Sequence, residues 1–114
     1  MQSNFGVEVR DEQRAVVIGV SGELDLASSP ELEQELDRGI SSSAELLIID
    51  LRTLEFMDST GLSVVVRAHQ RATERGKQLA IVKGPQQVQR LLTLTGVADR
   101  LTVVDTPEEL LAGS

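Results

Sequence analysis

One segment of the sequence, Asp58-Ser59-Thr60-Gly61-Leu62, combines side chains that could do chemistry: a carboxylate, two hydroxyls and a glycine. The first interpretation is structural, because Asp58 or Ser59 can cap the N-terminus of a helix and such caps are common. The second is a binding site, because a glycine beside two hydroxyls lets the backbone of a partner come close. The residue types alone leave both interpretations open.

The expected surroundings of this segment favour a binding site. It follows the apolar run 46–49, which predicts a strand buried on both faces of a sheet covered by helices, and a connecting segment, 51–57. We therefore expect it near the carboxyl edge of the sheet, where the ligand sites of α/β proteins collect. The loop 22–26 follows another predicted strand and can bring Asp25 to the same edge.

The sequence contains no recognisable enzymatic arrangement. His69 is the single histidine and falls on the apolar stripe of a predicted helix, where a structural role is more common than a catalytic one, since a catalytic base needs a partner. HExxH, GxSxG, Walker and GxGxxG patterns are missing, so we predict no catalytic residue. Cysteine is missing too, which excludes disulfides, cysteine zinc sites and thiol catalysis.

Asp50 suggests a further hypothesis, a receiver-like phosphotransfer domain, because it stands at the end of the predicted central strand. Such a domain needs an acidic pair after its first strand to hold magnesium. Neither 7–10 nor 15–20 ends in an acidic pair. Asp50 is therefore predicted more simply as a turn residue that ends the strand.

Composition limits the class of protein. With 114 residues, 40% hydrophobic and 2% aromatic, the chain suits one domain with an aliphatic core. The net charge of −7 repels phosphate backbones and few aromatics are available to stack on bases, so we expect no nucleic-acid partner. The N-terminus does not resemble a secretory signal, and no apolar run approaches the roughly 20 residues that cross a bilayer. We expect a soluble cytoplasmic protein with no membrane partner.

Hydrophobic periodicity and capping residues predict the order β-β-α-β-α-β-α-β-α. The first two strands should form a hairpin, and Ser28 or Ser29 should cap the helix that begins near Pro30. The expected strands are 7–10, 15–20, 46–49, 79–82 and 101–104, and the expected helices follow Pro30, Asp58, Gly84-Pro85 and Thr106. The fold class is α/β, with a mostly parallel mixed sheet of about five strands and about four helices.

Two motifs resemble markers of the STAS-domain anti-sigma factor antagonists. The segment 56–62, Phe-Met-Asp-Ser-Thr-Gly-Leu, is similar to the signature of that family, and 22–25 with Pro30 resembles its other marker. The strand 46–51 and Gly96-Val97 also match, so the resemblance spans nearly the whole chain and implies a single STAS domain over 1–114. Many members carry a second glycine where this chain has Ser63, but a small residue is kept and we expect little consequence.

The resemblance implies a regulated binding protein rather than an enzyme. Its partner would be an anti-sigma factor that is also an ATP-dependent serine kinase with an ATPase fold, and this kinase phosphorylates Ser59. The unphosphorylated protein binds the kinase and releases the sigma factor, and a PP2C-type phosphatase resets the switch. The implied partner-binding residues are Asp25, Asp58, Ser59, Thr60, Gly61 and Leu62. ATP and magnesium belong to the kinase, so no cofactor or metal is expected in this chain, and nothing demands more than a monomer.

An alternative function is a constitutive STAS accessory subunit of a transport or signalling complex, in which Ser59 is only a helix cap. Thr60 is an alternative phosphate acceptor within the switch hypothesis. Its methyl group and its position one residue further into the helix make it a poorer fit to an incoming kinase.

Overall fold

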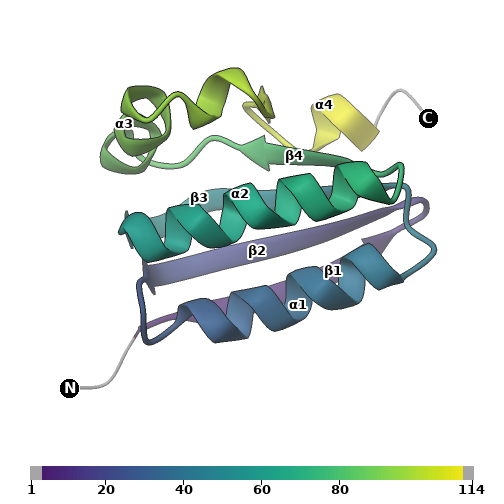
Figure 1. Ribbon diagram of the computed structural model, residues 1–114, viewed down its shortest axis with the longest axis horizontal. Helices are drawn as coiled ribbons and strands as arrows, with labels where there is room; N and C mark the ends of the chain where they lie inside the picture. Colours follow the sequence, from purple (N-terminus) through teal and green to yellow (C-terminus); the bar gives the residue numbers. More distant parts are fainter. Residues whose placement is uncertain (1–3, 112–114) are drawn as a thin grey trace.

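The computed structural model describes residues 4–111, in which one five-stranded sheet carries helices mainly on one face (Figure 1). The strand order is β1-β2-β3-β4-β5; β1 is antiparallel to β2 and the other neighbours are parallel. The strands are β1 (Gly6–Glu12), β2 (Ala15–Leu24), β3 (Leu46–Met57), β4 (Gln78–Val82) and β5 (Thr102–Val104). The helices are α1 (Ser29–Ser41), α2 (Ser59–Glu74), α3 (Gln86–Leu94), the 3₁₀ turn η1 (Val97–Asp99) and α4 (Glu108–Leu111). The predicted fold class and order of elements are confirmed.

The main core lies between the sheet and the three long helices. Each of α1, α2 and α3 connects one strand to its parallel neighbour, and each connection moves across the sheet in the same direction. Since such crossovers are right-handed, the three helices lie on the same face of the sheet. The predicted stripe of α1 is buried, with Leu32, Leu36 and Ile40 at most 2% exposed. Side chains of α2 and α3, including Val65 and Leu92, join the same cluster. The three valines 64–66 have a low helix propensity, but they lie within α2 because burial of its apolar face against the core outweighs that preference.

The second face of the sheet is covered only in part. Val17, Ile48 and Val82 form a small cluster there, against which Leu110 and Leu111 of α4 pack. Leu47 and Ile49 of β3 point into the main core while Ile48 points into this cluster, so the prediction that 46–49 is buried on both faces is confirmed for 47–49.

Two predicted strand ends are wrong. β2 continues beyond Ser21 to Leu24, and β3 continues beyond Asp50 to Met57. The cause is mutual pairing: the two strands stay paired up to Leu24 opposite Met57, although the register shifts between Gly19 and Ser21 and again between Gly22 and Glu23. Asp50 is consequently a strand residue and not a turn residue, and the segment 51–57 is not a separate connection.

The glycine and capping signals in the second half are confirmed. Gly96 has φ +79°, the left-handed conformation that favours glycine after a helix, and Val97 beyond it is buried. The Glu109 carboxylate accepts a hydrogen bond from the Thr106 backbone N–H at 2.9 Å, as a capping box requires. Across residues 4–111, no helix is long and apolar enough to cross a membrane.

Candidate functional site

The N-terminus of α2 begins with the segment that the sequence singled out. Asp58 is the N-cap, and its Oδ1 accepts a hydrogen bond from the Gly61 backbone N–H at 3.0 Å. Ser59 is the first helical residue; it is exposed, and its hydroxyl has no hydrogen-bond partner among residues 4–111. The capping role therefore belongs to Asp58, which leaves the Ser59 hydroxyl available to an incoming group.

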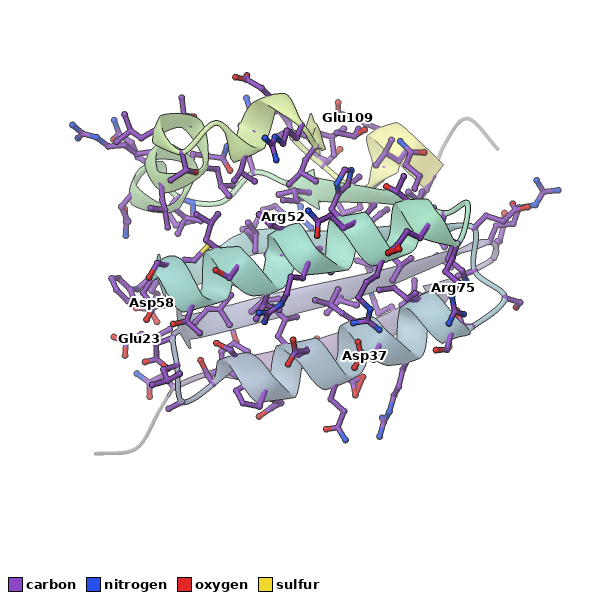
Figure 2. The ribbon with its side chains drawn as sticks, viewed as in Figure 1. Glu23, Asp37, Arg52, Asp58, Arg75 and Glu109 are labelled. Atoms are coloured by element: carbon purple, nitrogen blue, oxygen red, sulfur yellow. The ribbon has the colours of Figure 1, made fainter. Side chains whose placement is uncertain are left out.

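Asp25 lies at the same edge of the sheet as Asp58, as the chain order predicted. Leu24 pairs with Met57, and the Asp58 backbone N–H donates to the Leu24 carbonyl at 3.1 Å. The residues that follow each strand are therefore neighbours. Figure 2 shows this edge through its labelled residues, Glu23 and Asp58, which lie together at one end of the molecule.

The loop that carries Asp25 is fixed by its own side chains. The Asp25 Oδ1 accepts hydrogen bonds from the backbone N–H groups of Ala27 at 3.0 Å and Ser28 at 3.1 Å. The Ser28 hydroxyl donates to the Glu23 carbonyl at 2.7 Å and accepts from the Asp25 backbone N–H at 2.9 Å. Ser28 is thus the N-cap residue by position, but its side chain ties the loop and does not cap α1, contrary to the sequence prediction.

Thr60, Gly61 and Leu62, which follow Ser59 in α2, are less exposed than Ser59. Gly61 is buried, and a Cβ added to it would lie 2.7 Å from Leu24 Cγ and 3.1 Å from Met57 Cγ. The missing side chain is therefore explained by packing inside the protein, and the interpretation that it admits the backbone of a partner is not needed. Thr60 and Leu62 are half-buried. Ser63 donates its hydroxyl to the Ser59 carbonyl at 2.9 Å.

Comparison with known proteins agrees with this architecture. Residues 6–110 match the STAS domain. The chain belongs to the STAS family. The anti-sigma F factor antagonist of Paenibacillus polymyxa is 27% identical over 103 residues, which cover 90% of this chain and 88% of that relative. The crystal structure of an anti-sigma factor antagonist from Mycobacterium paratuberculosis has a TM-score of 0.87 at 26% identity, covering 96% of this chain and 93% of the other. The Bacillus cell fate determinant SpoIIAA in its phosphorylated form has a TM-score of 0.71 at 21% identity, covering 95% and 96%.

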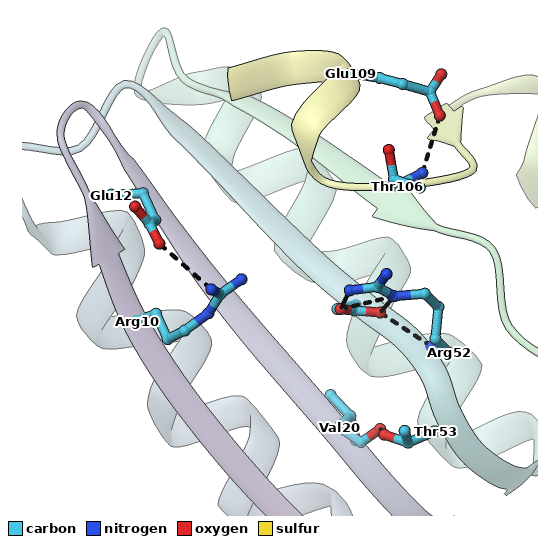
Figure 3. Close-up of polar contacts among 8 residues, drawn as sticks. Arg10, Glu12, Val20, Arg52, Thr53, Thr106 and Glu109 are labelled. Carbon is cyan, nitrogen blue, oxygen red and sulfur yellow. Dashed lines mark hydrogen bonds and ion pairs between the residues drawn. The ribbon is translucent and has the colours of Figure 1, made fainter. Parts of the chain in front are cut away.

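Asp50 of this STAS domain lies away from Ser59, on the second face of the sheet with Val17, and forms an ion pair with Arg52. Figure 3 labels Arg52 and marks these contacts with dashed lines. The guanidinium donates from Nε to Oδ1 at 3.0 Å and from a terminal nitrogen to Oδ2 at 2.7 Å. Burial of the Asp50 carboxyl raises its pKa, but the hydrogen bonds and charge of Arg52 outweigh burial and leave the pKa below the ordinary value. The carboxylate is thus engaged by an arginine, and residues 4–111 hold no group of three acidic, His or Cys side chains that could hold a metal ion.

Replacing Asp50 by Asn is expected to lower the free energy of unfolding at pH 7 by about 1 kcal/mol. Hydrogen bonds to charged groups contribute about 1.5–3 kcal/mol, and solvent around the half-exposed Arg52 reduces this. Because the folded-state pKa is depressed, the contribution is present above the unfolded-state pKa and is lost as the pH falls through the folded-state pKa. Urea unfolding of both proteins should show a constant difference from about pH 7 to about pH 5 that shrinks below about pH 4. A difference independent of pH contradicts this assignment.

Sequence reasoning missed two residues at the Ser59 edge. Leu26, in the loop of Asp25, and Phe56, at the end of β3, are large apolar side chains that are 75% and 47% exposed. The expected end of β3 at Asp50 left Phe56 outside any predicted strand. In the structure the strand does not alternate beyond Asp50: Leu51, Leu54 and Met57 are buried, and the two residues between each buried pair are exposed, Phe56 among them. Because the register shifts break the alternation, a regular strand pattern does not predict that Phe56 is exposed.

Proposed function

We propose that this STAS domain is an anti-sigma factor antagonist that is switched by phosphorylation of Ser59. The unphosphorylated protein binds an anti-sigma factor serine kinase of ATPase fold and so releases the sigma factor, and phosphorylation abolishes binding. The observation that carries the proposal is the exposed, unbonded Ser59 hydroxyl at the start of α2, next to the loop of Asp25. The names of the STAS relatives support the antagonist role.

The position of Ser59 favours a phosphate that leaves the fold intact. The first N–H groups of a helix have no partner within the helix, and its N-terminus carries a partial positive charge. In the first turn of α2, the Asp58 side chain accepts a hydrogen bond only from the backbone N–H of Gly61. A phosphoserine, with roughly −1.5 to −2 charges near neutral pH, is therefore tolerated locally.

The same phosphate is incompatible with the bound state. During phosphoryl transfer the Ser59 hydroxyl must face the γ-phosphate of ATP in the kinase, so a phosphate on Ser59 meets negative charge from the nucleotide. The carboxylates of Asp25 and Asp58 add to that field from the antagonist's side. A buried charge without a partner costs about 3–5 kcal/mol, which weakens binding by roughly two to three powers of ten.

The proposal assigns the catalytic work to the partners. The kinase supplies ATP and magnesium and a PP2C-type phosphatase removes the phosphate, so this chain provides the acceptor hydroxyl and a docking surface without a cofactor or a catalytic residue. The proposed partner-binding residues are Asp25, Asp58, Ser59, Thr60 and Leu62, and Gly61 belongs to this segment as the buried residue that packs it on Leu24. We propose that the protein acts as a monomer in the cytoplasm.

Capture with a Ser59→Ala bait from host lysate, followed by reconstitution with ATP, tests this function. Mass spectrometry should identify an anti-sigma factor of kinase-like ATPase fold, and that purified protein should phosphorylate the wild type at Ser59 by phosphopeptide mapping. Modification of Thr60 would move the acceptor by one residue and keep the mechanism. Retention of the same large assembly by both Ser59→Ala and Ser59→Asp baits would support a constitutive accessory subunit instead.

A further inference from the structure

We infer that Leu26 and Phe56, here called the apolar pair, form the hydrophobic centre of the surface that binds the anti-sigma factor, and that the partner meets it with apolar side chains surrounded by lysines or arginines. This inference rests on the proposed function and adds to it the residues that provide most of the affinity and the chemistry of the complementary surface.

The exposure of the apolar pair needs an explanation. Single exposed apolar residues are common, but only four large hydrophobic residues are exposed in the described chain: Val9, Leu26, Phe56 and Leu94. Phe56 is one of only two phenylalanines in 114 residues. Two of these four side chains gather at the edge that carries the unbonded Ser59 hydroxyl.

Chain geometry keeps the apolar pair close to Ser59. Phe56 pairs with Glu23 across β2 and β3, and Leu26 follows Glu23 by three residues, a distance of at most about 11 Å along the chain. Ser59 follows Phe56 by three residues as well. An interface of ordinary size covers about 800 Å² on each partner, enough to contain all three side chains. Exposed Leu and Phe side chains at the middle of such an area lose the most water on binding and act as anchors.

The charges around the apolar pair define the partner. The segments 22–30 and 53–61 contain four carboxylates, those of Glu23, Asp25, Glu55 and Asp58, and neither segment contains Lys or Arg. A partner that covers the apolar pair must therefore place cations, not carboxylates, around it, because like charges across an interface are strongly unfavourable. These cations pair with the carboxylates at the rim, while Ser59 faces the nucleotide of the kinase.

The test measures binding of the variants to the purified anti-sigma factor that the Ser59→Ala bait retains. We expect Leu26→Ala and Phe56→Ala each to raise the Kd by about tenfold or more. Val9→Ala is the matched control, since Val9 is also an exposed apolar residue, at 45%. It lies on β1 opposite Ile18, which is six residues along β2 from Leu24 and therefore away from the Ser59 end of the sheet. Its truncation should change the Kd less than about twofold. Thermal unfolding of each variant should still show one cooperative transition well above the temperature of the binding assay, because at most about half of each truncated side chain is buried.

A second pair of variants tests the charged rim. The double substitution of Glu23 and Glu55 by Gln should lower the association rate about tenfold at low salt and flatten its salt dependence. Asp11→Asn with Glu74→Gln removes the same charge at the opposite end of the molecule, where Figure 2 shows Arg75, and should change the rate far less. If Ser59→Asp abolishes binding while the Leu26 and Phe56 variants bind like wild type, the inference is wrong and the proposed function stands. If the bait retains no anti-sigma factor, both fail.

Discussion

Ser59→Asp is expected to bind the anti-sigma factor about 100- to 1000-fold more weakly than the wild-type protein, and Ser59→Ala is expected to bind as tightly as wild type. The Ser59 side chain is exposed at the first position of α2 and makes no hydrogen bond within residues 4–111, so its loss as a hydroxyl removes nothing from the fold. Under the proposed function, a carboxylate there would lie against the nucleotide of the kinase, beside Asp58. Titration calorimetry with the purified partner gives both values of Kd.

A charge control separates this local effect from the overall net charge. Ser43 is also an exposed serine, but it lies between α1 and β3 at the opposite edge of the sheet. Ser43→Asp adds the same charge and should leave the Kd within about twofold of wild type, because exposed charges separated by more than about 10 Å are largely screened at 0.1 M salt. Equal weakening by both aspartates would show a general charge effect, and tight binding by phosphorylated wild-type protein would refute the switch.

The helices and strands could be predicted from the sequence because each is indicated by residues that lie close together in the chain. The helical spacing of Leu32, Leu36 and Ile40, the capping box at Thr106 and the glycine at position 96 depend on residues a few positions apart. The meeting of Asp25 and Asp58 is not local, but it could still be predicted, because residues that follow neighbouring parallel strands gather at one edge of the sheet.

The features that were missed depend on long-range pairing. The extension of β2 to Leu24 and of β3 to Met57 exists because the two strands satisfy each other's backbone groups over their whole length, and neither segment alone shows it. The outward direction of Phe56 and the inward direction of Gly61 follow from that extension. The Ser28 side chain could cap α1 or tie the loop, and only the folded position of the Glu23 carbonyl decides between them.

The second large effect concerns Leu24 and Gly61, which join the two halves of the site. Leu24 is fully buried, and its truncation to Ala is expected to cost about 2–5 kcal/mol. Gly61→Ala is expected to cost about 1–3 kcal/mol, because the added Cβ would lie 2.7 Å from Leu24 Cγ in a closely packed core. Urea unfolding of both single variants measures these costs.

The double variant decides whether this contact is the reason for the glycine. Leu24→Ala removes the two nearest atoms that the new Cβ meets and leaves Met57 Cγ at 3.1 Å, so the combined cost should be smaller than the sum of the single costs by about 1 kcal/mol or more. Ile40→Ala with Gly61→Ala is the matched control, since Ile40 is buried near the far end of α1, and its costs should add within about 0.5 kcal/mol. Additive costs for Leu24 and Gly61 would mean that another feature excludes a side chain at position 61. Coupling would mean that the loop of Asp25 and the helix start of Ser59 share one packing contact, so that the position of either is set by the other.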